Sequence, residues 1–130
     1  MTKNTKVNAA ILIIGNEILS GRTKDTNTST LATWLNTIGV KVEEVRVIPD
    51  IEKTIVDTLN FLRTNYNYVF TSGGIGPTHD DITAESVYKA LRIKYEMHKE
   101  AFKILQVYYK SGEFNKKKKK MVWMPENANL

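Results

Sequence analysis

The sequence predicts an α/β domain built as a three-layer sandwich, with a mainly parallel sheet between two layers of helices. Apolar runs at residues 9–14, 40–47 and 68–71 predict three strands. Each run is followed by apolar residues at helical spacing, so strand and helix alternate along the chain. Consecutive units of this kind join parallel strands and place helices on both faces of the sheet.

The individual elements follow from local patterns. The second strand changes phase at Glu43 and Glu44, which predicts a β-bulge or a strand edge there. Asp50 is placed to cap the helix after that strand, although it could equally face a ligand. The predicted helices are marked by apolar residues within 31–38, 51–62, 84–91 and 95–109, the last of which contains His98.

The chain has the size and composition of one domain. Of its 130 residues 42% are apolar, and we assign residues 1–8 to a flexible tail and 9–130 to the domain. The absence of cysteine excludes a disulfide framework, a thiolate zinc site and a cysteine nucleophile. The first apolar run is too short for a signal peptide or a membrane span. We therefore expect a cytoplasmic protein with no membrane partner.

The net charge of +5 comes from one segment. Residues 116–120 are five consecutive lysines, and the other 14 basic residues balance the 14 acidic ones. A lysine run without interleaved aromatic residues or arginines is typical of a solvated loop. We therefore expect no nucleic-acid partner, and the sequence assigns the run no role.

Polar residues gather in three loops that follow the predicted strands. These loops are residues 15–27, 49–50 and 72–81. In open parallel sheets ligands bind beyond the carboxyl ends of the strands, which is where these loops would meet. The sequence therefore predicts a ligand site at this edge of the sheet.

The third loop, which reads SGGIGPTHDD, suits an anion. Gly73 and Gly74 can turn backbone N–H groups towards a ligand, and Ser72 and Thr78 add hydroxyl donors. The glycines would equally fit an ordinary tight turn, because the spacing matches neither the P-loop nor the dinucleotide fingerprint. The candidate ligand-binding residues here are Ser72, Gly73, Gly74, Gly76 and Thr78.

Two adjacent carboxylates, Asp80 and Asp81, complete this loop. Carboxylates beside a phosphate site suggest a divalent cation, because Mg²⁺ is commonly held by one or two carboxylates together with phosphate oxygens. We therefore take Asp80 and Asp81 as candidate metal ligands. Asp81, Asp50 and Glu17 are the candidate catalytic residues, and His79 is expected only to line the site.

The first loop suits a polar ligand. Asn16, Glu17, Asp25 and Asn27 could contact hydroxyls, a heterocycle edge or metal-bound water. The alternative is that they satisfy backbone groups of the loop and the start of the next helix. Arg22 and Lys24 are the cations expected near a phosphate.

Three segments together resemble the molybdopterin-binding domain family, which includes the MoaB and MogA cofactor-biosynthesis proteins. They read GNEILSGRTKDTNTSTLATWL, VIPD and VFTSGGIGPTHDDITAESV, and the resemblance extends over residues 9–130. The form GPTHDD is most similar to the N-terminal domain of the competence/damage-inducible CinA proteins. In the cofactor-biosynthesis branch an arginine often stands where this chain has Asp80.

The resemblance implies roles for the candidate residues. It implies that Ser72, Gly73 and Gly74 cradle a phosphate and that Asp81 is essential and linked to a metal. It also implies that Asp50 is a second key acid, and that Glu17, Asp25 and Asn27 belong to a motif of the first loop.

The resemblance also implies three alternative functions. The CinA-like branch implies metal-dependent hydrolysis of a nucleotide pyrophosphate such as ADP-ribose. The other branch implies binding or adenylylation of molybdopterin in molybdenum cofactor biosynthesis. Family domains continue past a segment like MPENANL into further strands, so the third alternative is a non-catalytic domain that lacks its C-terminal strands. A homo-oligomer is expected in each case.

Overall fold

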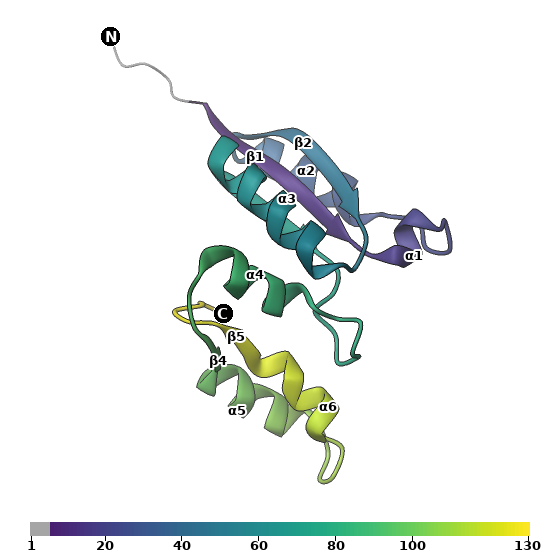
Figure 1. The fold of residues 1–130 in the computed structure, drawn as a ribbon, viewed down its shortest axis with the longest axis vertical. Helices are drawn as coiled ribbons and strands as arrows, with labels where there is room; N and C mark the ends of the chain where they lie inside the picture. The colour runs from purple at the N-terminus through teal and green to yellow at the C-terminus, as the bar shows by residue number, and fades with distance from the viewer. Residues whose placement is uncertain (1–5) are drawn as a thin grey trace.

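The computed structural model describes residues 6–130, which form an α/β domain around a parallel sheet (Figure 1). The strands are β1 (Val7–Ile14), β2 (Val40–Ile48) and β3 (Tyr68–Ser72), in the order β2-β1-β3. Both pairings are parallel, so the predicted fold class is confirmed. Most of the predicted tail lies outside the described residues, and β1 begins at Val7.

Helices cover both faces of this sheet. α3 (Glu52–Asn65) lies across one face and α2 (Asn27–Thr37) across the other, while the short α1 (Asn16–Leu19) follows β1 directly (Figure 1). The central strand is buried on both sides, which explains why residues 9–14 are apolar without alternation. On the α3 face the core consists of Ala10, Leu12, Ile14, Ile48, Ile55 and Leu62.

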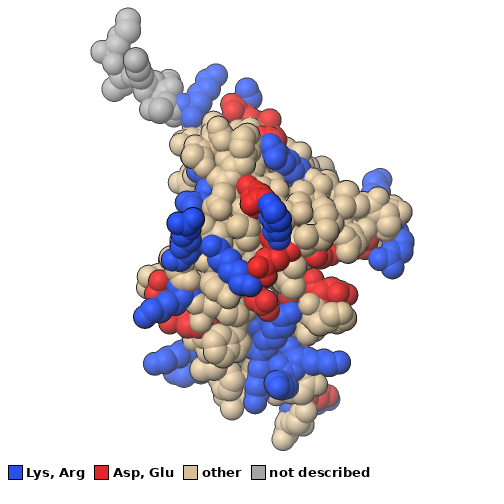
Figure 2. All heavy atoms as spheres, viewed as in Figure 1, with Lys and Arg blue, Asp and Glu red and all other residues tan. Residues whose placement is uncertain are grey.

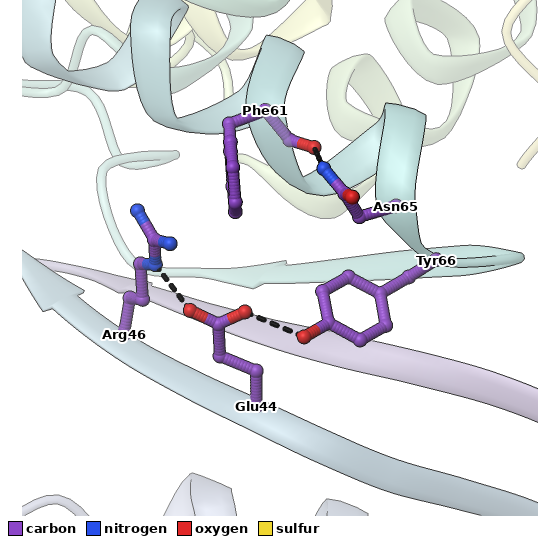
Figure 3. Close-up of polar contacts among 5 residues, drawn as sticks. All are labelled: Glu44, Arg46, Phe61, Asn65 and Tyr66. Atoms are coloured by element: carbon purple, nitrogen blue, oxygen red, sulfur yellow. Dashed lines mark hydrogen bonds and ion pairs between the residues drawn. The ribbon is translucent and has the colours of Figure 1, made fainter.

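The predicted bulge in β2 is present. Ala9 pairs with Val42 and Ala10 with Glu44, so Glu43 is left over and the strand changes phase. As a result Glu44 faces α3, where it accepts hydrogen bonds from the Tyr66 hydroxyl at 2.6 Å and from Arg46 at 2.5 Å (Figure 3). The Tyr66 hydrogen bond, followed by that of Arg46, lowers the pKa of the Glu44 carboxyl.

This polar cluster also covers the edge of α3. The Arg46 guanidinium lies 4.6 Å from the centre of the Phe61 ring, and the Asn65 side chain donates to the Phe61 carbonyl at 2.8 Å (Figure 3). A charged pair is thus packed against an aromatic face where the bulge turns it inward. The bulge decides which residues of β2 meet α3.

The last third of the chain forms a second, smaller unit beyond α4 (Thr83–Leu91). Its antiparallel strands β4 (Tyr95–Met97) and β5 (Trp123–Pro125) lie beside α4, which packs on α3 (Figure 1). Between them come α5 (Lys99–Tyr108), α6 (Lys116–Lys119) and the 3₁₀ turn η1 (Lys120–Val122).

Two sequence interpretations were wrong in this unit. The helix expected over residues 95–109 begins only at Lys99, because 95–97 pair with β5 and His98 caps the helix. The His98 ring accepts a hydrogen bond from the Ala101 N–H at 3.2 Å. The lysine run is helical rather than a loop, and the Asn115 side chain caps it by accepting from the Lys118 N–H at 3.1 Å. Across residues 6–130 no helix has the length and hydropathy needed to cross a bilayer.

Candidate functional site

A polar cleft opens at the carboxyl ends of the three parallel strands. Its volume is about 270 Å³, and its walls come from all three loops that the sequence marks. The lining residues are Asn16, Glu17, Arg22, Asp50, Gly74, Thr78, Asp80 and Asp81. Four carboxylates therefore share one small cleft with a glycine-rich loop.

Close packing explains the glycines of that loop. Gly73 has φ +97°, and a Cβ there would lie 2.0 Å from the carbonyl oxygen of Ile14 at the end of β1. Gly74 has φ +69°, and its Cβ would lie 2.2 Å from the Thr83 hydroxyl. Thr83 fixes the loop by donating its N–H to the Gly74 carbonyl and its hydroxyl to the Gly73 carbonyl, at 3.0 and 2.8 Å. The turn thus brings bare backbone to the wall of the cleft.

Asp81 is the best-anchored acid of the cleft. One carboxylate oxygen accepts from the Thr78 N–H at 2.9 Å and from the Thr78 hydroxyl at 2.7 Å. Partial burial, the largest single effect, acts to raise the pKa of Asp81. The hydrogen bonds from Thr78 and the Gly76 backbone, with the charge of Lys120, outweigh it and lower the pKa. Asp81 is therefore a fixed anion at neutral pH.

Asp80 lies at the mouth of the cleft. Its carboxylate is 3.1 Å from the His79 Nε2, and both side chains are mostly exposed. His79 itself lines a neighbouring groove and not the cleft, contrary to our expectation. Asp80 is therefore accessible from solvent although it contacts His79.

Asp50 joins the ends of two strands. Its carboxylate accepts from the Asn16 N–H at 3.2 Å, at the start of α1. The helix-cap interpretation was wrong, because Ile51 occupies the cap position of α3 and no side chain caps that helix. Glu17 folds back over Gly15, where an added Cβ would lie 2.6 Å from its carboxylate. Both acids thereby point from the first two strand ends into the cleft.

Asp25 and Asn27 lie outside the cleft lining. Asp25 accepts from the N–H groups of Asn27 and Thr28 at 3.0 and 3.3 Å, and from the Thr28 hydroxyl. The Thr28 hydroxyl is the main cause of the lowered pKa of Asp25. The Asn27 side chain donates to the Ser72 hydroxyl at 2.8 Å, which ties α2 to the end of β3. These residues support the site from behind, as the backbone-satisfying alternative predicts.

Lys120 is the residue that sequence reasoning missed. Its Nζ donates to the Thr78 carbonyl at 2.6 Å, and its charge acts on Asp81. Of the two cations expected near the site, Arg22 lines the cleft and Lys24 does not. No local pattern identifies Lys120, because the bond to Thr78 spans 42 residues and the lysine run reads as a solvated segment.

An apolar cleft lies on the other side of the glycine loop. It also measures about 270 Å³ and shares Gly74 and Asp81 with the polar cleft, and Gly76 lines it as well. Its far wall contains Tyr95, whose ring stacks on Tyr88 at 4.7 Å between centroids. Burial raises the pKa of Tyr95 to about 12, so its hydroxyl stays protonated. A flat ring and a charged group could thus be held on the two sides of one loop.

The carboxylates do not form a complete metal cage. No set of three or more His, Cys, Asp or Glu residues among 6–130 is arranged to hold an ion. All four acids of the cleft nevertheless offer oxygen, the donor that Mg²⁺ prefers, and Mg²⁺ needs only one or two carboxylates when phosphate supplies the rest. The residues fit a Mg²⁺ ion that enters with a phosphorylated ligand.

The fold and the cleft define an α/β ligand-binding domain with its site at the carboxyl edge of a parallel sheet. Residues 10–129 match the family described as "Probable molybdopterin binding domain". The chain belongs to this molybdopterin-binding domain family.

Individual relatives agree with this assignment. Proteins of Pyrobaculum calidifontis and Sulfurisphaera tokodaii are 36% and 38% identical to it, over 92% of this chain and 47% of each relative. The chain thus spans about half the length of these curated relatives. The crystal structure of CinA from Thermoplasma acidophilum, 30% identical, superposes with a TM-score of 0.86 over 95% of this chain and 73% of that chain. The CinA-like character of the domain is therefore confirmed.

The cofactor-biosynthesis proteins share the fold. The molybdopterin biosynthesis enzyme MoaB of Thermus thermophilus is 18% identical and superposes with a TM-score of 0.62, over 82% of this chain and 66% of that chain. MoaB of Pyrococcus furiosus, described as a tungsten cofactor synthesizing protein, gives 20% identity and the same TM-score and coverage. At this identity the likeness concerns the architecture alone.

Proposed function

We propose that the domain binds a phosphorylated nucleotide-like ligand in the polar cleft and hydrolyses a pyrophosphate such as that of ADP-ribose. The observation that supports this proposal is the set of four carboxylates on a glycine-rich wall. Acids alone would repel phosphate, but a divalent cation between carboxylate and phosphate removes the conflict. The family membership and the likeness to CinA favour a ligand of this class.

The two clefts suggest where the parts of such a ligand bind. The phosphates lie against Gly74 and Thr78, where backbone and hydroxyl donors are available. The heterocycle enters the apolar cleft, whose lining includes Tyr95 and Trp123, two rings that contact each other at 5.7 Å between centroids. Arg22 reaches the same phosphates from the first loop.

The acids take different parts in the reaction. Asp81 is a poor proton acceptor, because its hydrogen-bond donors already stabilise the anion, and it suits the cation instead. Glu17, whose carboxylate packs over Gly15, takes the proton of the attacking water, with Asp50 beside it. Water adds to one phosphorus, the bridging P–O bond breaks, and AMP and ribose 5-phosphate leave. Bound Mg²⁺ supplies neutralisation of the charge that develops on the phosphate oxygens.

The test is calorimetry and AMP release with ADP-ribose, with and without Mg²⁺. We expect Asp81→Asn to weaken Mg²⁺-dependent binding, and Glu17→Gln to lower turnover by about 100-fold with a smaller effect on affinity. Asp57→Asn is the control, because Asp57 pairs with Lys53 on the exposed side of α3. The assignment fails if Asp81→Asn leaves the metal-dependent hydrolysis intact.

Molybdopterin is the second candidate ligand, and the family description favours it. Titration with molybdopterin separates the two candidate ligands. A pterin-binding domain gives heat with molybdopterin and none with ADP-ribose. A chain that gives no heat with either ligand is the non-catalytic domain. The same titrations on a chain extended past Leu130 show whether further residues are needed.

A further inference from the structure

A broad groove lies between the glycine-rich loop and the lysine helix. Its volume is about 870 Å³, larger than either cleft. The lining residues are Pro77, Thr78, His79, Asp80, Asn115, Lys116, Lys117, Lys118 and Lys120. Four lysines and one acid, Asp80, thus line the groove.

Lysines 116–118 and 120 take part in no ion pair within the described chain, although the charge of Lys120 acts on Asp81. Among residues 6–130 every ion pair within 4.0 Å involves other residues than 116–120. Lys118 lies over the Tyr109 ring at 4.2 Å, and Lys120 bonds the Thr78 carbonyl. Figure 2 shows Lys and Arg atoms crowded over α6, with Asp and Glu atoms above them. An anion would relieve the repulsion among these lysines.

The backbone of the lysine run is held in place. Asn115 caps its start, and the η1 turn that follows it ends at Val122, which is fully buried and accepts a hydrogen bond from the His98 N–H at 2.7 Å. Lys120 ties it to the ligand loop. The backbone that carries these lysines is therefore held beside the groove and does not belong to a loose surface segment.

The groove continues the polar cleft. Thr78 and Asp80 line both, and the carbonyl of Thr78 receives Lys120 while its N–H and hydroxyl bind Asp81. Lysine ammonium groups bind phosphate as point charges, and several together suit a chain of phosphates. We propose that this groove is a second anion site that binds a phosphate chain, either as a free polyphosphate or as phosphate groups of a ligand in the cleft.

The test uses inorganic tripolyphosphate in calorimetry without Mg²⁺. We expect one binding site, weaker at higher salt, whose affinity falls at least about tenfold in the double variant Lys116→Gln/Lys117→Gln. The matched control is Lys99→Gln/Lys103→Gln, which removes the same charge from two exposed positions of α5. Equal affinity in the groove variant and the unmodified chain, or equal loss in the control, overturns the proposal.

Two further arms identify the source of the phosphate. If Asp81→Asn still binds tripolyphosphate and the groove variant still binds ADP-ribose, the anion is a free polyphosphate. If the groove variant also loses affinity for ADP-ribose, the groove receives phosphates of the cleft ligand; this part rests on the proposed function. If tripolyphosphate binds and ADP-ribose does not, the proposed function is refuted and the anion site in the groove is still supported. If a short single-stranded oligodeoxynucleotide binds these lysines more tightly than tripolyphosphate does, the ligand of the groove is nucleic acid and the phosphate-chain proposal is wrong.

Discussion

The substitution Gly73→Ala tests the close contact between the glycine-rich loop and the central strand. The new Cβ would lie 2.0 Å from the Ile14 carbonyl oxygen, a backbone atom that cannot rotate away. The positive φ costs about 1–2 kcal/mol for a residue with a Cβ, and overpacking a tight site adds about 1–3 kcal/mol. Ala also restricts the unfolded chain, which offsets about 0.4–1 kcal/mol.

Comparison with Gly112→Ala isolates the overpacking cost from the other two effects. Gly112 has φ +84°, but an added Cβ there meets nothing within 4 Å. The control therefore carries the φ cost and the unfolded-state gain without the collision. We expect Gly73→Ala to be less stable than Gly112→Ala by about 1–3 kcal/mol.

Urea unfolding followed by far-UV circular dichroism measures this difference at constant m-value. The ADP-ribose titration of the folded fraction adds a functional readout, which should weaken only for Gly73→Ala. Equal destabilisation by the two substitutions would refute the reasoning, because it would show that the loop does not approach β1 in the folded chain.

Three further substitutions test other parts of the molecule. Asp81→Asn should flatten the acid limb of the pH–stability curve. The Asp81 pKa is lower in the folded chain than the value near 3.8 of the unfolded chain, so Asp81 stabilises the fold above that value and loses this effect as the pH falls through its folded pKa. Urea midpoints measured against pH check this. Tyr66→Phe removes the main donor to Glu44, so NMR titration should show the Glu44 pKa rising towards its ordinary value, and an unchanged pKa would contradict the contact. Leu62→Ala should cost about 2–5 kcal/mol, against less than about 0.5 kcal/mol for Val107→Ala, because Leu62 is fully buried and Val107 is 87% exposed.

The sheet could be predicted from the sequence because its signals are local. The unbroken apolar run of residues 9–14 indicates a strand covered on both faces, and burial on both sides confirms it. The bulge also leaves a local mark, since two acids in succession break the alternation at Glu43 and Glu44. The parallel order then follows from the alternation of strands and helices.

The C-terminal unit could not be predicted in the same way. Tyr95 becomes part of a strand because it pairs with Pro125, and its ring stacks on Tyr88 and contacts Trp123. Pro125 and Trp123 both belong to β5, far along the chain, so residues 95–97 read locally as the first turn of the next helix. Tertiary pairing overrides helical spacing here.

The candidate site shows the same contrast between local signals and contacts that are distant in the sequence. The strand ends that carry Glu17, Asp50 and Asp81 could be placed from topology, because parallel strands end at one edge. The choice between cap and ligand for Asp50 could not be made, because its partner Asn16 lies 34 residues away. Asp25 illustrates the converse, since its partners are its own neighbours and its role is local.

Side-chain hydrogen bonds between distant segments join the loops of the cleft to one another. Asn16 to Asp50 links the first two strand ends, Asn27 to Ser72 links the first loop to the third, and Lys120 to Thr78 links the C-terminal unit to the third.

These bonds span 34, 45 and 42 residues, so none of them can form before the domain folds. The acids are therefore oriented by folding itself, and little further ordering is left to a ligand. Any ligand that bridges Asp50, Gly74 and Asp81 also holds these segments together. Such a ligand must raise the stability of the domain in proportion to the logarithm of its concentration above Kd.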